Sequence, residues 1–254
     1  MTQVYFVGAG PGDPELITVK GLDVIRRAGV IIYAGSLVNV AVLAERRSDA
    51  QVHDSAGMTL EEVLEATLRG VAAGQTVARV HTGDPSLYGA IQEQIDALEA
   101  KGVACEVIPG VSSFTAAAAA LRREFTLPAV SQTVILTRLE GRTPVPERER
   151  LESLAAHQAS MCVFLSVQNI DEVARQLGRH YPPDTPVAVV QRASWPDEVC
   201  VRGTLADIAG KVKAARIGKT AQILVGRFLG GGYEKSRLYD KAFSHGHRTA
   251  EGGR

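Results

Sequence analysis

Hydrophobic positions along the chain follow two patterns in turn, short continuous runs and helical spacing. Apolar, β-rich runs of strand length occur in the first half at residues 3–7, 30–33, 76–80 and 103–108. Apolar residues at helical spacing follow these runs, at residues 16–25, 60–71, 91–98 and 114–121. Strands that alternate with helices are typical of βαβ units, so we predict an α/β fold with a mostly parallel first sheet.

Two of the helix starts are marked by local sequence. Pro14-Glu15 is a favourable entry to the first helix, because proline and an acidic residue suit a first turn. Thr59-Leu60-Glu61-Glu62 has the form of a capping box, in which the first and fourth side chains bond to each other's backbone N–H. We expect helices to begin at both places.

The second half repeats the alternation with one interruption. Strand-like runs lie at residues 133–136, 161–165, 187–190, 200–203 and 221–225, and helical spacing at 149–156, 170–177 and 205–212. The turn cluster Ser194-Trp195-Pro196-Asp197 separates two of these strands without room for a helix. An antiparallel pair is expected there, so the second sheet should be mixed.

These patterns divide 254 residues into two α/β domains. We expect an N-terminal domain over residues 1–121, a linker at 122–130 and a C-terminal domain over 131–229. Residues 230–254 are rich in Gly, Arg and His and poor in apolar side chains, so this tail should be partly disordered.

Composition excludes several classes of protein. Hydrophobic residues make up 45% and charged residues 22% of the chain, the ordinary globular mix. No apolar run approaches the roughly 20 residues of a membrane span, and residues 1–12 lack the pattern of a signal peptide. Cys105, Cys162 and Cys200 are too few and too scattered for a disulfide framework or a zinc site, so we expect no metal and a cytoplasmic protein.

The formal net charge is zero, which argues against a nucleic-acid binder. The charge is nevertheless uneven, because residues 1–127 carry 10 basic and 15 acidic side chains whereas residues 128–254 carry 18 and 13. Such an asymmetry can steer an anionic small molecule toward the second half. A solvated surface with a basic tail explains the same counts.

Three loops follow predicted strands of the first domain and therefore lie where α/β sheets bind ligands. They are Gly8–Asp13, Thr82–Pro85 and Pro109–Ser113. The first differs from the dinucleotide fingerprint Gly-x-Gly-x-x-Gly, because its third glycine, Gly12, is one position early and Asp13 takes the sixth place. The second strand also ends in Tyr33-Ala34-Gly35-Ser36, without the acidic residue that binds a ribose.

Small residues and hydroxyl groups in these loops allow backbone groups to approach a flat heteroaromatic ring. Each loop by itself is equally typical of a tight turn. A tight turn without a role in ligand binding therefore remains an alternative for each loop taken singly.

Together the motifs resemble one family, the tetrapyrrole (porphyrin/corrin) methylases that use S-adenosylmethionine. The resemblance rests on residues 7–13 with 16–21, Gly83-Asp84-Pro85, residues 107–113, 187–190 and 202–205, and Ile223-Leu224-Val225-Gly226. Within the family, residues 33–38 look like the branch that methylates C11 of precorrin-4 in cobalamin (vitamin B12) synthesis, giving precorrin-5. Residues 234–239 resemble the members whose substrate lacks cobalt.

The resemblance implies two α/β domains with an active-site cleft between them, and a homodimer. It also implies contacts to S-adenosyl-L-methionine, and to the product S-adenosyl-L-homocysteine, from Pro11, Thr82, Gly83, Asp84, Leu87, Ser112, Ser113, Ser166, Ala193, Thr220 and Ala221. Relatives place methionine where this chain has Ser166, and some have glycine at Ala193.

The substrate contacts are predicted from charge. A tetrapyrrole carries many carboxylates, which arginines bind well. The candidates on this ground are Arg122, Arg123, Arg138 and Arg192, and Gly10 of the first loop is a further candidate substrate contact. Asp84 is the one candidate catalytic residue, in the role of orienting the cofactor, and stabilisation of a turn is its structural alternative. His53 and His81 are interpreted as structural.

The implied reaction is an in-line transfer of a methyl group to a ring carbon, which requires alignment and a dry site rather than a protein nucleophile. Alternatives in the same family are cobalt-precorrin-4 methylation and uroporphyrinogen-III methylation. An NAD(P)-dependent oxidoreductase and a corrinoid carrier without catalysis are the alternatives outside it. Binding of a membrane or of nucleic acid is not expected.

Overall fold

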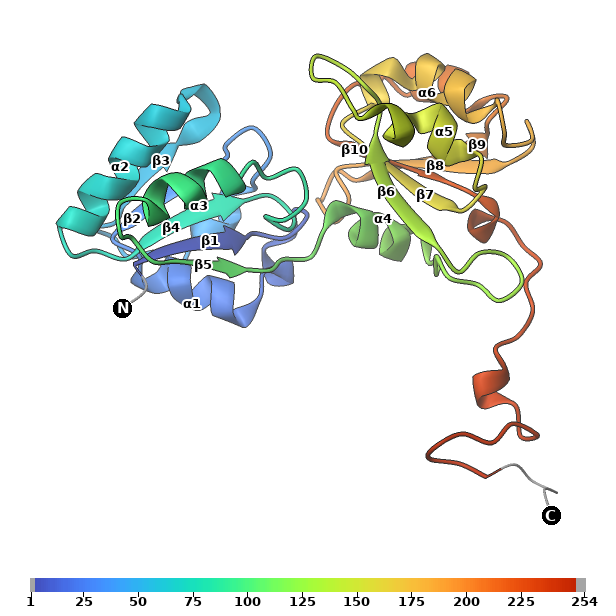
Figure 1. Cartoon of the computed structure of the whole chain (residues 1–254), viewed down its shortest axis with the longest axis horizontal. Helices are drawn as coiled ribbons and strands as arrows, with labels where there is room; N and C mark the ends of the chain where they lie inside the picture. The colour runs from blue at the N-terminus through green and yellow to red at the C-terminus, as the bar shows by residue number, and fades with distance from the viewer. Residues whose placement is uncertain (1–2, 250–254) are drawn as a thin grey trace. The chain divides into compact units, whose positions relative to one another are not determined.

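The computed structural model describes residues 3–249 and contains two compact units (Figure 1). Unit 1 comprises the chain up to Ala117 together with Arg192–Val199, and unit 2 comprises Ala118–Gln191 and the chain from Cys200 on. The first division falls inside a helix, α4 (Ser113–Leu121), four residues before the limit expected from the sequence. The expected linker at 122–130 lies within unit 2, and the segment Arg192–Val199 contributes to unit 1.

The sheet of unit 1 has five strands in the order β3-β2-β4-β1-β5. Their bounds are β1 (Val4–Gly8), β2 (Val30–Tyr33), β3 (Gln51–Asp54), β4 (Val77–His81) and β5 (Cys105–Ile108). Every neighbouring pair is parallel, which confirms the predicted parallel sheet. The sequence did not predict β3, an edge strand whose residues are mostly exposed and therefore lack a buried apolar run.

Helices cover both faces of this sheet (Figure 1). Val24 and Ile25 of α1 (Val19–Arg27) are buried in the core of one face. On the other face Val63 and Ala66 of α2 (Leu60–Ala72) and Leu98 of α3 (Gln92–Glu99) are buried. Short 3-10 helices complete the unit, η1 (Pro14–Leu16), η2 (Val40–Leu43) and η3 (Ser55–Gly57).

The two predicted helix starts have different outcomes. The capping box at Thr59 and Glu62 is present, with both side chain–backbone bonds formed. The start at Pro14 is wrong for the long helix, because Pro14–Leu16 form a separate 3-10 turn and Ile17 is extended. The helix α1 begins after Thr18, whose hydroxyl caps it by accepting from Gly21 N–H at 3.0 Å.

The sheet of unit 2 is mixed, as predicted, with the order β6-β7-β10-β8-β9. Its strands are β6 (Val134–Arg138), β7 (Ser160–Phe164), β8 (Pro186–Gln191), β9 (Val199–Thr204) and β10 (Ala221–Val225). β6 and β7 are parallel, whereas β10 is antiparallel to both β7 and β8. Leu205, which follows β9, donates its N–H to the C=O of Thr185, which precedes β8. The end of β9 therefore lies beside the start of β8, as an antiparallel pair requires.

The helices of unit 2 bury their apolar sides in one core cluster with β7, β8 and β10. They are α5 (Leu151–Ala155), α6 (Ile170–Leu177) and α7 (Ile208–Ala214), with the 3-10 turns η4 (Glu147–Glu149), η5 (Val167–Asn169), η6 (Arg227–Leu229) and η7 (Arg237–Tyr239). Of the tail expected to be partly disordered, residues 230–249 are described and contain η7, and residues 250–254 lie outside the described residues.

Three features bear on the classes considered from composition. Within residues 3–249 no helix has the length and apolar character needed to cross a bilayer. The same residues contain no group of three or more His, Cys, Asp or Glu placed to hold a metal ion. No disulfide joins any two of Cys105, Cys162 and Cys200.

Candidate functional site

The three loops singled out in the sequence meet at one edge of the first sheet. Because β1, β4 and β5 are adjacent and parallel, their carboxyl ends lie side by side. Ala9 N–H donates to His81 C=O at 2.8 Å. Gly10 and Gly83 exchange two backbone bonds, 2.8 Å from Gly83 N–H and 3.3 Å from Gly10 N–H. The first and second loops are therefore a continuous backbone layer beyond the sheet.

Glycines make the close contact of the third loop possible. A Cβ placed on Gly110 would lie 2.1 Å from the carbonyl oxygen of Gly83 and 2.8 Å from Cα of Gly8. A Cβ on Gly8 would lie 2.6 Å from Cα of Gly110. Gly10 and Gly83 also have positive φ, +79° and +61°, which favours glycine at both positions. The loops thus combine tight turns with close backbone packing, because Gly8, Gly10 and Gly83 are buried and Gly110 is half-buried.

The carboxylate of Asp84 connects two of these loops. Its Oδ2 accepts from Gly110 N–H at 2.9 Å, and its Oδ1 accepts from the backbone N–H and the hydroxyl of Ser86. Partial burial raises the pKa of Asp84, but the hydrogen bonds from Ser86 and Gly110 outweigh it, so the pKa lies below its usual value. Asp84 is therefore ionised at neutral pH, with both oxygens bonded inside the protein.

The remaining cofactor candidates of unit 1 line the same edge. Thr82 in the second loop and Leu87, two residues beyond it, are half-buried. Ser112 is buried and Ser113 half-buried where the third loop enters α4. The structure therefore brings all the predicted cofactor residues of the three loops to one place.

The first loop, Gly8–Asp13, follows β1 and is called the β1 loop below. Its backbone is fixed by hydrogen bonds to side chains that were not predicted from the sequence for this role. The indole Nε1 of Trp195 donates to Pro11 C=O at 2.9 Å. Asn39 Nδ2 donates to Gly12 C=O at 2.8 Å, and Asp13 N–H donates to the hydroxyl of Ser194 at 3.0 Å. Three successive residues are thus each fixed by a partner distant in sequence.

The segment around Ala193 and Arg192 belongs to unit 1, although both residues were predicted as contacts from the second domain. Ala193 is buried. Arg192 stacks on the Trp195 ring, 4.1 Å from its centroid, and its Nε lies 2.9 Å from an oxygen of Asp197. Its guanidinium is therefore held within its own loop.

The other candidates of the second half gather at one edge of the second sheet. Ser166 follows β7, and Thr220 and Ala221 stand where antiparallel β10 begins. Ala221 pairs with Gln191, the last residue of β8. The Ser166 hydroxyl accepts from Leu139 N–H at 2.9 Å and donates to Phe164 C=O at 2.6 Å, so it joins the loops that follow β6 and β7.

The arginines predicted to bind the substrate are placed differently from one another. Arg138 ends β6 at this edge and donates to the carbonyls of Leu139, Thr143 and Pro144, which shapes its own loop. Arg122 is exposed just beyond α4, and Arg123 is half-buried next to it. Of these arginines, only Arg138 joins the group formed by Ser166, Thr220 and Ala221.

Strained backbone marks the same loops. Non-glycine residues with positive φ include Tyr88 and Ala90 in the loop after β4, and Leu165, Arg192, Ser194 and Thr220 near the ends of β7, β8 and the start of β10. Arg122, Gln158 and Arg216 also have positive φ, but they follow helices, where this conformation is common. Strain of this kind is typical of functional loops, because packing must hold it in place.

Two buried polar side chains, Arg79 and His81, belong to β4, the strand that precedes the second loop. Arg79 of β4 donates to Gln94 Oε1 at 3.1 Å and to Ile32 C=O at 3.2 Å, and burial lowers its pKa to about 10. His81 is 5% exposed and packs beside Phe6. Burial, together with the charge of Arg79, lowers the pKa of His81 to about 3, so the imidazole is neutral. The structural interpretation of His81 agrees with this environment, and His53 lies on the edge strand β3.

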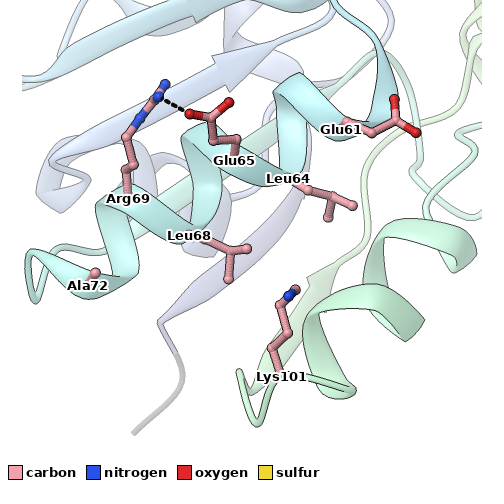
Figure 2. A pocket seen from close by; sticks show the side chains of 7 residues that line it. All are labelled: Glu61, Leu64, Glu65, Leu68, Arg69, Ala72 and Lys101. Atoms are coloured by element: carbon pink, nitrogen blue, oxygen red, sulfur yellow. Dashed lines mark hydrogen bonds and ion pairs between the residues drawn. The ribbon is translucent and has the colours of Figure 1, made fainter.

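A shallow pocket of about 480 Å³ lies elsewhere in unit 1, along the outer side of α2 (Figure 2). Leu64 and Leu68 point into it toward Lys101, and the ion pair of Glu65 with Arg69 lies at its rim. None of the predicted site residues lines it, so the pocket is separate from the loop cluster.

The chain is similar to known proteins over most of its length. Residues 3–209 match the family of Tetrapyrrole (Corrin/Porphyrin) Methylases. A cobalt-precorrin-4 C(11)-methyltransferase of Methanocaldococcus jannaschii is 56% identical, with 98% of this chain and 96% of the relative covered. A precorrin-4 C(11)-methyltransferase of Pseudomonas aeruginosa is 50% identical, with 98% and 99% covered.

Two solved structures share the fold. One is a cobalt precorrin-4 methyltransferase of cobalamin biosynthesis, with a TM-score of 0.88 and 48% identity over 90% of this chain and 96% of that one. The other is a uroporphyrin-III C-methyl transferase of Thermus thermophilus in complex with S-adenosylhomocysteine, with a TM-score of 0.77 and 30% identity over 89% and 98%.

Proposed function

The chain belongs to the tetrapyrrole (corrin/porphyrin) methylases, and on this premise we propose that it transfers a methyl group from S-adenosyl-L-methionine to C11 of precorrin-4, giving precorrin-5 in cobalamin biosynthesis. The observation that carries the proposal is similarity over nearly the whole chain to proteins named for methylation of this carbon. The three-loop cluster of unit 1 supports it from the structure.

The loop cluster suits a small cationic ligand. The ionised carboxylate of Asp84 places a negative charge beside the loops, which favours a sulfonium and an ammonium group nearby. Thr82, Ser112 and Ser113 add hydroxyl groups, and Gly83 lies against the third loop, since a Cβ there would be 3.6 Å from Cα of Ser112. We assign the binding of S-adenosyl-L-methionine to these residues with Pro11 and Leu87.

The residues of this chain bind and align rather than react. When bound, S-adenosyl-L-methionine supplies a methyl group that is already activated for transfer to carbon. The protein must hold donor and acceptor in line at about 3–3.5 Å and exclude water. Asp84 acts as a positioning residue, because both of its oxygens hold Gly110 and Ser86 in place. The contacts from Ser166, Ala193, Thr220 and Ala221 complete the proposed set.

The substrate contacts follow from the carboxylates of the tetrapyrrole. Gly10, Arg122, Arg123, Arg138 and Arg192 are proposed to meet the macrocycle, with the guanidinium groups paired to its carboxylates. Arg138 and Arg192 are already oriented by their own loops, which lowers the entropy lost when a carboxylate binds.

The form that contains cobalt is a second candidate substrate. It is favoured by the relative with 56% identity and by the solved structure with a TM-score of 0.88, both named for cobalt-precorrin-4. The relative with 50% identity is named for precorrin-4 itself. Turnover of the two macrocycles, compared in one assay, assigns the metal state.

The state and place of the protein are also proposals. We propose a cytoplasmic homodimer that binds neither nucleic acid nor a membrane. No disulfide joins Cys105, Cys162 and Cys200, which suits a reducing compartment. Sedimentation equilibrium of the purified chain should give twice the 27.0 kDa mass of one chain. A mass of 27.0 kDa at all concentrations would contradict the dimer.

Isothermal titration calorimetry tests the class of ligand directly. The full chain should bind S-adenosyl-L-homocysteine and S-adenosyl-L-methionine with one site per chain, and it should not bind NADP. Binding of NADP alone would support the oxidoreductase alternative. Binding of a corrinoid without either adenosyl ligand would support a carrier.

A further inference from the structure

The β1 loop depends on a residue that lies 184 positions further along the chain. Pro11, Gly12 and Asp13 are fixed by Trp195, Asn39 and Ser194 respectively, and two of these partners come from the segment Arg192–Val199. Trp195 both donates a hydrogen bond to the loop and packs against it, since its indole lies where a Cβ of Gly12 would be. Its ring therefore restricts the shape of the loop at two successive residues.

Gly12 shows how close the ring lies. A Cβ on Gly12 would be 2.0 Å from Cδ1 and Nε1 of the indole, far inside van der Waals contact. Gly12 does not have the positive φ that favours glycine at Gly10. The reason for glycine at this position is therefore the indole itself, which occupies the place of a side chain.

The ring cannot move aside freely. Nε1 is bonded to Pro11 C=O, and the guanidinium of Arg192 covers the ring at 4.1 Å. Ser194 N–H donates to Glu198 at 2.8 Å, which closes the segment on itself. Arg192 and Ser194 have φ of +51° and +70°, conformations that persist only when surrounding contacts hold them. The segment is thus built to present the indole in one orientation.

We propose that Trp195 is a positioning residue of the cofactor site, which fixes the β1 loop at Pro11 and Gly12 in the conformation that binds S-adenosyl-L-methionine. The proposal rests on the proposed function, because Pro11 is among the assigned cofactor contacts. Trp195 acts through the loop and does not touch the reacting atoms. Its effect should therefore appear in the affinity for the adenosyl ligand.

The pair formed by Gly12 and Trp195 allows a double-mutant test. In W195A the bond and the ring are both lost, and the dissociation constant for S-adenosyl-L-homocysteine should rise about tenfold, the equivalent of one or two hydrogen bonds. W195F keeps an aromatic ring without the donor and should fall between W195A and the unmodified chain. G12A should also weaken binding, because its methyl group displaces the indole.

The distinguishing outcome is the double variant G12A/W195A. Without the ring the methyl group added at position 12 has room, so G12A should add little to the effect of W195A. G57A is the matched control, since nothing lies within 4 Å of a Cβ at Gly57 in the same unit. It should leave affinity unchanged. In steady state the variants should raise KM for S-adenosyl-L-methionine more than they lower kcat.

Fluorescence reports on the environment of the indole in the unmodified chain and in the variants. Trp195 is the only tryptophan of the chain, so its emission reports this contact alone. Acrylamide should quench it weakly in the unmodified chain and in G57A, and more strongly in G12A. Titration with S-adenosyl-L-homocysteine should change the emission with the dissociation constant found by calorimetry.

Two different failures can be told apart. If the unmodified chain binds no adenosyl ligand, the proposed function is contradicted and the inference falls with it. If the unmodified chain binds and W195A, W195F and G12A all match its dissociation constant and KM, the inference alone is overturned. Effects of G12A and W195A that multiply in the double variant would also overturn it.

Discussion

Asp84 joins two loops with one carboxylate, and this arrangement predicts the effect of its removal. D84A loses the acceptor for Gly110 N–H and for Ser86, and with it the negative charge beside the loops. Its dissociation constant for S-adenosyl-L-homocysteine should rise by about 10- to 100-fold, as expected for lost hydrogen bonds to a charged group. D84N, which keeps one oxygen acceptor, should lie between. The methylated carbon should not change, and an unaltered affinity would contradict the role.

His81 gives a pH dependence of stability. Its folded-state pKa is lowered to about 3 by burial and by Arg79, whereas in the unfolded chain it is near 6.5. Between these values the unfolded chain binds the extra proton, so stability rises with pH. The contribution is complete above pH 6.5 and is lost as the pH falls toward 3, by at most about 1.4 kcal/mol per pH unit.

The variant H81Q isolates this contribution from that of the carboxylates. Urea unfolding of both proteins is measured at pH 7, 6, 5 and 4. The free energy of unfolding of the unmodified chain should fall relative to that of H81Q as the pH falls. Parallel curves over this range would mean that His81 is protonated in the folded protein as easily as in the unfolded chain.

At the scale of single residues, the functional residue types could be predicted from the sequence, but their contacts with residues distant in the chain could not. Thr82, Ser112 and Asp84 could be selected because their residue types follow predicted strands. Trp195 appeared only as part of a turn cluster, since its contact with Pro11 connects residues 184 positions apart and leaves no local pattern. The one sequence signal of this contact was Gly12, the third glycine of the first loop. The reason for a glycine there becomes clear only from the structure, where the Trp195 ring packs against it.

At the scale of elements, the contact of Gly8, Gly83 and Gly110 is the feature that brings the loops together. In G110A the added methyl group would overlap the carbonyl oxygen of Gly83, a backbone atom that cannot rotate away. The second and third loops must then separate, and Asp84 loses the N–H of residue 110. We expect calorimetry to detect no binding of S-adenosyl-L-homocysteine, while G57A binds normally. Normal binding by G110A would mean that the loops need not touch.

The order of strands and helices was predictable because buried strands and amphipathic helices differ in the spacing of apolar residues. The strand β3 escaped because an exposed edge strand needs no apolar run. The start of α1 was misplaced because Pro14 and Thr18 are both good first-turn signals, and only Thr18 caps the long helix. Local signals thus fixed the kind of element more surely than its limits.

At the scale of the whole molecule, the uneven charge of the chain predicts a dependence on salt. The second half carries the excess of basic residues, and the proposed substrate is an anion with several carboxylates. If this field steers the macrocycle, its KM should rise as ionic strength increases from about 0.01 to 0.15 M, where the screening length shortens from about 30 to 8 Å. A KM independent of salt would assign the charges to the solvated surface alone.

The membership in a methylase family and the loop cluster lead to one product. The full chain is incubated with precorrin-4, and separately with its cobalt form, in the presence of S-adenosyl-L-methionine labelled with ¹³C in the methyl group. NMR of the macrocycle then locates the label. We expect a new ¹³C-methyl group on C11, with one S-adenosyl-L-homocysteine released for each methyl group transferred. A label on another ring carbon, or no transfer to either macrocycle, would contradict it.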